Sequence, residues 1–277
     1  YSRLLTFTDG YLDSRQKTTQ YNGGATFSYP VVLTGKQQFN INGGMDYTDR
    51  RNDNNIRAIL NDETLGDATQ KTHVRYPALE FGMNGFQAFE RASINGKLTL
   101  RQGINAGSLA DSAPIQGNDL SFTLWKSNID AAWMVTDTWR LSTSMEGDWS
   151  DNDLPEPERV SFGAQRFGRG YQDGEASGDY GYGGQVEVRY LHQRKESTWI
   201  ATVQPYVLAD TAQTWFNTQG LPHQRLASVA TGVMFGDNKH YSLTVEAARP
   251  VGDLPTDSHK RDWRYSLTLS WNFNNLH

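Results

Sequence analysis

The end of the chain alternates strictly between apolar and polar residues. In the segment RYSLTLSWNF (264–273), every second residue is apolar: Tyr265, Leu267, Leu269, Trp271 and Phe273. A period of two places alternate side chains on opposite faces of a β-strand. The segment therefore predicts a strand with one polar and one apolar face, and the aromatic residues Tyr265, Trp271 and Phe273 lie on the apolar face.

The same pattern recurs along the whole chain. Examples are ATFSYPVV (25–32), INGKLTL (94–100), WRLSTSMEGDW (139–149) and LASVATGVMF (226–235). Short connections such as 33–36 and 135–138 join some of these segments, whereas 49–71, 102–118, 151–180 and 250–262 are long and hydrophilic. Tight turns at one end of the strands and long loops at the other are typical of outer-membrane β-barrels.

The pattern predicts about twelve strands. We expect them near residues 2–13, 19–33, 36–51, 72–88, 91–106, 119–136, 138–151, 180–193, 197–216, 224–237, 240–252 and 261–273. In the sixth, the apolar positions change parity between Leu124 and Ile129. Such a change predicts a β-bulge.

Composition favours a barrel in lipid over a soluble sheet. Hydrophobic residues make up only 37% of the chain and its mean hydropathy is −0.66, yet aromatic residues reach 12%. A soluble β-sandwich of 277 residues, the alternative, needs more Val, Ile and Leu for its core. A transmembrane barrel needs apolar residues on one face only, with aromatic residues at both membrane interfaces. We therefore predict an all-β, transmembrane antiparallel β-barrel.

Candidate chemistry is sparse. There is no cysteine, the six histidines show no metal-binding spacing, and no nucleophile–base motif occurs. The acidic string DNDLPEPE (151–158) lacks the spacing of an EF-hand, which predicts a solvated loop without a metal ion. A net charge of −5 without a basic cluster does not favour nucleic acid. We expect neither an enzyme nor a cofactor.

One glycine-rich loop, 161–180, does stand out. It contains Gly163-Ala164, Arg169-Gly170-Tyr171 and the segment GEASGD, which includes Gly174, Gly178 and Asp179. The next strand contains Glu187 within EVRY, and the strand after it reads QPYVLADTAQTW, which includes Asp210. A mobile surface loop would not need this series of short motifs.

These motifs resemble those of the two-partner secretion translocators, the outer-membrane barrels that export haemolysins and adhesins. The family's loop carries a Gly-Gly turn, VRGY or VRAY, and a GEGSGD-like segment. An ELRY-like strand and a QPYxFxDxGxxW-like strand follow. This chain departs from the pattern at Ala164, where the family has glycine, and at Gly168, where valine is usual.

The resemblance implies a barrel of sixteen strands, in which five strands follow the signature loop. We count seven strands before the loop and five after it. The chain is therefore expected to be the last twelve strands of sixteen, or else a compact twelve-stranded barrel. Residues 1–277 would be the barrel domain, without the periplasmic domains that precede it in the family.

The resemblance also implies a function. The protein would lie in the outer membrane of a Gram-negative bacterium and export a large passenger polypeptide. Its other partners would be membrane lipid, lipopolysaccharide and the barrel assembly machinery. The signature loop would enter the lumen, where Arg169 would pair with Asp210. The alternatives are a passive channel, a polysaccharide exporter and a surface receptor.

Overall fold

The computed structural model describes residues 2–6, 10–60, 63–106, 109–111, 119–164, 166–193, 199–221, 223–237 and 239–272. These residues form an all-β structure with a single 3-10 helix, η1 (Glu156–Glu158). Within these ranges no helix is long and apolar enough to cross a membrane.

The main sheet of the described residues is antiparallel and has fourteen strands, twelve of which follow one another in chain order. They are β1 (Ser2–Thr6), β2 (Gly10–Leu33), β3 (Gln37–Leu60), β4 (Glu63–Ala88), β5 (Ala92–Gly103), β7 (Thr123–Met134), β8 (Trp139–Trp149), β11 (Tyr180–Tyr190), β13 (Thr202–Trp215), β14 (Gln224–Gly236), β15 (Tyr241–Pro250) and β16 (Arg264–Trp271). The short strands β6 (Leu109–Asp111) and β12 (His192–Gln193) pair with β4 and β13. Seven strands of the path precede the loop and five follow it, which confirms the predicted count.

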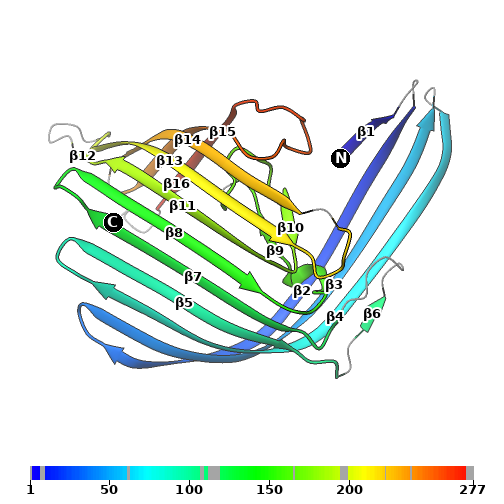
Figure 1. The fold of residues 1–277 in the computed structure, drawn as a ribbon, viewed down its shortest axis with the longest axis horizontal. Coiled ribbons are helices and arrows are strands. Elements are labelled where there is room, and N and C mark those ends of the chain that lie inside the picture. The colour runs from blue at the N-terminus through cyan, green and yellow to red at the C-terminus, as the bar shows by residue number, and fades with distance from the viewer. Residues whose placement is uncertain are drawn as a thin grey trace.

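The sheet curls strongly, so that it has a concave and a convex face (Figure 1). The connection between β8 and β11 lies on the concave side. It contains η1 and a separate two-stranded sheet of β9 (Val160–Phe162) and β10 (Ala176–Gly178).

Two predicted boundaries are wrong. The expected strand at 2–13 contains parts of two strands, because β1 ends at Thr6 and β2 already begins at Gly10. The expected loop at 49–71 is mostly strand, since β3 runs to Leu60 and β4 begins at Glu63. Polar residues can continue a strand when their backbone groups pair across a hairpin, and hydrophobic alternation does not detect such extensions.

The predicted bulge in the sixth strand is also wrong. The register between β5 and β7 is continuous from Gln102↔Thr123 to Ala92↔Trp133. Leu124 points to the concave face, where it is fully buried with Phe122 and Leu154, whereas Ile129 is exposed on the convex face. The apolar positions change parity because the loop covers part of the concave face and creates a small core there.

The convex face carries aromatic residues at two levels. Trp139 and Trp149 lie at the two ends of β8 and are 46% and 51% exposed, with Met145 between them on the same face. Trp133 and Trp125 repeat this arrangement on β7. Trp139 and Trp149 are ten residues apart on β8, at a rise of ~3.3 Å per residue. If the strand is tilted by ~45° from the membrane normal, the two levels are about 23 Å apart along that normal, close to the ~25 Å apolar band of outer-membrane barrels. The convex face is thus matched to lipid.

The last strand follows the same division. In the pairing of β15 with β16, Leu267 lies opposite Val245, and Ser266 lies opposite Glu246. Glu246 is buried on the concave side, so Tyr265, Leu267 and the other odd-numbered residues through Trp271 face the convex side. Phe273 lies outside the described residues.

Candidate functional site

The connection from 150 to 179 is folded against the inner wall of the sheet. Ala176 pairs with Phe162, and Gly178 with Val160, so the base of the loop is closed by β9 and β10. Phe162, Phe167 and Tyr171 are buried with Ala212 and Leu226 of the wall. The loop is therefore part of the packed interior of the protein.

The loop tip is held by hydrogen bonds to three adjacent strands. The backbone N–H of Arg169 donates to Oδ2 of Asp210 on β13 at 3.1 Å, and the N–H of Gly170 donates to Oγ of Ser228 on β14 at 3.0 Å. The Arg169 guanidinium donates through Nη1 to Oε2 of Glu246 on β15 at 2.8 Å. Asp210, Ser228 and Glu246 are each at most 6% exposed, so these contacts, the tip contacts, are shielded from water.

The structure brings Arg169 and Asp210 together, but not through the guanidinium that an ion pair between the two side chains would use. Asp210 receives the backbone amide instead. The guanidinium reaches past it to Glu246, whose carboxylate also accepts the hydroxyl of Tyr206 at 2.6 Å. Hydrogen bonding of the amide fixes Arg169 Cα close to β13, which directs the long side chain toward β15.

Tyr171 fastens the tip to the connection after β15. Its hydroxyl donates to the carbonyl of Asp253 at 2.8 Å, and the side chain is 1% exposed. Burial raises the pKa of Tyr171, so the hydroxyl remains a donor throughout the physiological pH range. Next to it, a Cβ on Gly170 would lie 2.4 Å from the nitrogen of Pro250, which leaves room only for glycine.

Both departures from the family pattern lie at positive φ, which suits Gly168 but not Ala164. Ala164 has a φ of 49°, a conformation in which glycine is less strained than alanine. Gly168 has a φ of 123°, and a Cβ there would lie 2.8 Å from Leu226 Cδ1. In this chain valine at position 168 would be strained, because the positive φ and the nearby wall both disfavour it.

The remaining signature residues lie along the loop and on the strand that follows it. Gly163 and Gly174 are in the turns of the tip, Gly178 ends β10, and Asp179 closes the base. Asp179 Oδ1 accepts the N–H of Leu154 and Oδ2 accepts the N–H of Asn217, both at 2.9 Å. Glu187 faces the concave side of β11 and receives two hydrogen bonds from Arg189, at 2.7 and 2.9 Å.

The acidic string 151–158 is not the solvated loop that its charge predicts. Leu154 is fully buried and Glu158 is 4% exposed. Glu158 is neutralised by Arg101 of β5 at 2.8 Å, a pairing between residues 57 positions apart. Local sequence contains no signal for such a partner. Among the described residues, no cluster of three or more His, Asp or Glu side chains is placed to hold a metal ion.

A further ion pair joins the tip to the wall. Arg166 donates through Nε to Oε2 of Glu146 on β8 at 2.9 Å, and a second hydrogen bond joins the same side chains. These hydrogen bonds raise the pKa of Arg166. Sequence reasoning missed three wall residues that receive the tip or the base of the loop: Ser228, Glu246 and Arg101. The sequence did contain one indication of Glu246, because it is a carboxylate on the polar face of a strand that the alternating pattern predicts.

Comparison with known families identifies the chain. The model of the family described as haemolysin secretion/activation protein ShlB/FhaC/HecB matches residues 6–235. The chain belongs to this family. The family's members are outer-membrane β-barrels, so the chain is an outer-membrane protein.

Solved structures agree with this fold. CdiB from Acinetobacter baumannii matches with a TM-score of 0.66 at 17% identity, over 94% of this chain and 45% of that one. CdiB from Escherichia coli matches with a TM-score of 0.67 at 18% identity, over 94% of this chain and 48% of that one. The chain thus spans about half the length of these structures. A search of curated protein sequences finds no significant match.

Proposed function

We propose that residues 1–277 form the barrel domain of a two-partner secretion translocator, which exports a partner polypeptide through its lumen. The proposal is supported above all by the tip contacts of Arg169 and Gly170 with Asp210, Ser228 and Glu246. A loop that is fixed inside a polar lumen is placed to touch a polypeptide in transit. A loop that served as a surface receptor would instead present its motifs to the outside.

In this proposal the protein catalyses no covalent step and needs no cofactor. The secreted passenger is the substrate, lipid and lipopolysaccharide contact the convex face, and the barrel assembly machinery inserts the protein. The lumenal wall offers hydrogen-bonding and charged groups such as Lys97, Lys126 and Asp148, which suits an extended chain with exposed backbone groups.

A secretion assay in cells tests the proposal. The full-length protein and its partner are expressed together. The amount of partner in the medium is then divided by the amount of folded barrel, which is recognised on gels by its heat-modifiable mobility. Arg169→Ala should lower secretion about tenfold or more, since it removes a charge-assisted hydrogen bond and leaves Glu246 without its cation. The matched control is Asp173→Ala, which removes a charge from an exposed position of the same tip.

The outcomes separate the functions. Reduced secretion with a normal amount of folded barrel supports the translocator. Normal secretion in Arg169→Ala contradicts it and favours a passive channel, a polysaccharide exporter or a receptor, in which the loop has another task.

A further inference from the structure

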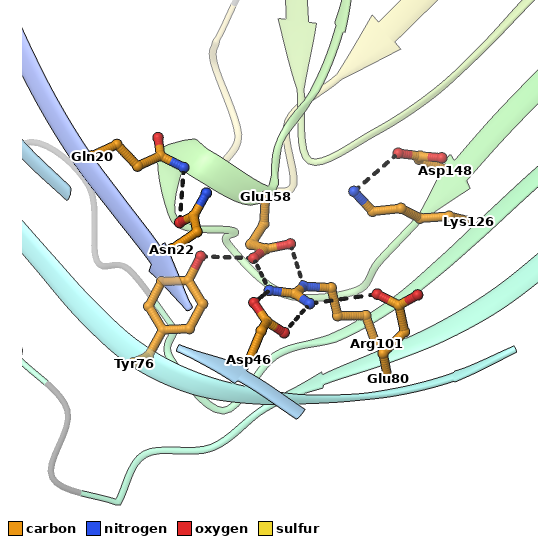
Figure 2. A network of polar contacts seen from close by, with 9 residues as sticks. All are labelled: Gln20, Asn22, Asp46, Tyr76, Glu80, Arg101, Lys126, Asp148 and Glu158. Atoms are coloured by element: carbon orange, nitrogen blue, oxygen red, sulfur yellow. Dashed lines mark hydrogen bonds and ion pairs between the residues drawn. The ribbon is translucent and has the colours of Figure 1, made fainter. Parts of the chain in front are cut away.

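The base of the loop makes a second set of buried polar contacts, far from the tip. Glu158, at the end of η1, extends to Arg101 on β5 (Figure 2). Arg101 donates through Nε to Glu158 Oε2 and through Nη2 to Glu158 Oε1, both at 2.8 Å. The hydroxyl of Tyr76 on β4 donates to the same carboxylate at 2.7 Å. Glu158 thus has three donors in a site that is almost closed to water.

Arg101 uses the rest of its guanidinium on the wall. Nη1 and Nη2 donate to the two carboxylate oxygens of Asp46 on β3, at 2.6 and 2.8 Å. Glu80 on β4 lies 3.6 Å from Nη1. The planar group therefore holds two carboxylates in bidentate geometry, which lysine cannot do.

Glu158 and the tip of the loop contact separate parts of the curled sheet. The contacts of Glu158 and Arg101 lie on β3, β4 and β5, whereas the tip contacts lie on β13, β14 and β15. In the sheet, β7, β8 and β11 separate these two groups of strands. The loop therefore crosses the concave side and is fastened at both ends (Figure 1).

The base contact is built so that it can open. If Glu158 leaves, Arg101 keeps Asp46 and Glu80, whose side chains are 30% and 37% exposed. No isolated buried cation is left behind, so opening avoids the largest cost of breaking a buried ion pair. A cavity of about 510 Å³ adjoins the contact, lined by loop and wall residues that include Lys126 and Asp148 (Figure 2), and it can admit water to the separated groups.

We infer that Glu158, Arg101, Asp46 and Tyr76 form a second, releasable fastening of the signature loop, here named the base latch. It holds the loop across the lumen together with the tip contacts, and the loop leaves the lumen only when both are open. The role of this movement in export rests on the proposed translocator function. Glu158 and Arg101 are positioning residues in this account.

Thiol labelling measures the base latch without any passenger. Residues 1–277 contain no cysteine, so Val160→Cys places a single reporter thiol in them. It lies on β9, at a buried position two residues from Glu158. The full-length protein in detergent or liposomes is treated with a water-soluble maleimide, with any cysteines outside this chain replaced by serine. Glu158→Gln should raise the labelling rate about tenfold or more, because loss of a charge-assisted contact shifts the opening equilibrium.

The matched control is Glu156→Gln, which removes the same charge from the same 3-10 helix. Glu156 pairs with Arg50 at 2.6 Å, but its side chain is 48% exposed, so its loss should change labelling little. Tyr76→Phe, which removes a single hydroxyl, and Arg101→Lys provide milder variants if Glu158→Gln does not fold. Both should raise labelling by less than Glu158→Gln, and heat-modifiable mobility reports folding in every case.

Each result decides the inference. Faster labelling in Glu158→Gln but not in Glu156→Gln supports the base latch. An unchanged rate, or an equal rise in both variants, overturns it. The proposed function is tested separately. If Glu158→Gln raises labelling but Arg169→Ala still secretes normally, the base latch is supported and the translocator function is contradicted. If labelling is unchanged and Arg169→Ala abolishes secretion, only the latch falls.

Discussion

The guanidinium of Arg169 lies 2.8 Å from the carboxylate of Glu246, two strands beyond the aspartate that its sequence motif suggests. Asp210 binds the same residue, Arg169, by accepting a hydrogen bond from its backbone N–H. The two carboxylates therefore have different tasks. Glu246 compensates the charge of Arg169, and Asp210 fixes the position of its main chain.

This division predicts different sensitivities at the two positions. Asp210→Asn keeps an oxygen that can accept the amide, so it should weaken loop docking by only about 1 kcal/mol. Glu246→Ala leaves a partly buried guanidinium without its counter-charge and should cost about 2–3 kcal/mol. Hydrogen–deuterium exchange of the peptide covering 163–175 measures both. Faster exchange in Asp210→Asn than in Glu246→Ala would contradict the assignment.

The close approach of Gly170 to β15 predicts a steric effect. Gly170→Ala should prevent docking of the tip, because its Cβ would meet the backbone at Pro250 at 2.4 Å. Exchange of the same peptide should then rise to the level of an undocked loop. Gly35→Ala is the control, since no atom lies within 4 Å of the added carbon. Similar exchange in wild type and Gly170→Ala would show that the tip is not packed on β15.

Ala164 offers the opposite test, a stabilising change. Its φ of 49° is in the left-handed region, so Ala164→Gly should relieve strain worth about 0.5–1 kcal/mol. Exchange in the loop should become slower, while the rest of the barrel is unaffected. Faster exchange would mean that this turn is not left-handed in solution.

The orientation of the two faces predicts an asymmetry between neighbouring residues. Met145 lies between Trp139 and Trp149 on the convex face, so Met145→Arg should destabilise the barrel by about 2–4 kcal/mol in lipid. Ser144→Arg, on the polar concave face, should cost much less. A urea titration of barrels refolded into liposomes measures the difference. Equal losses at the two positions would contradict the assignment of faces.

Sequence alone predicted the division of the chain around the loop. Alternation revealed the strands because each has one face toward lipid, and it gave seven strands before the loop and five after it. It failed where both faces of a strand are polar, as in the long hairpin of β3 and β4. It also failed for Leu124, where the loop turns part of the wall into a core.

The site was also predictable only in part, because its contacts depend on how distant parts of the chain pack together. The motif around Arg169 identified the loop, but the partners of Arg169 and Glu158 depend on strand register and on how the loop crosses the sheet. Glu246 and Arg101 are 77 and 57 residues from the groups they bind. No local pattern encodes contacts of that range.

The central claim, that the signature loop covers the inner wall at β14, is tested most directly by a thiol at Ser228. This side chain is 1% exposed beneath Gly170, and Ser228→Cys changes its size little. The thiol should resist a small, water-soluble methanethiosulfonate in an otherwise wild-type barrel and react readily once Arg169→Ala is added. Thr244→Cys, on the inner face of β15 and partly exposed, should react in both backgrounds. Rapid reaction at position 228 without Arg169→Ala would contradict the account, because the loop could not then lie on this wall.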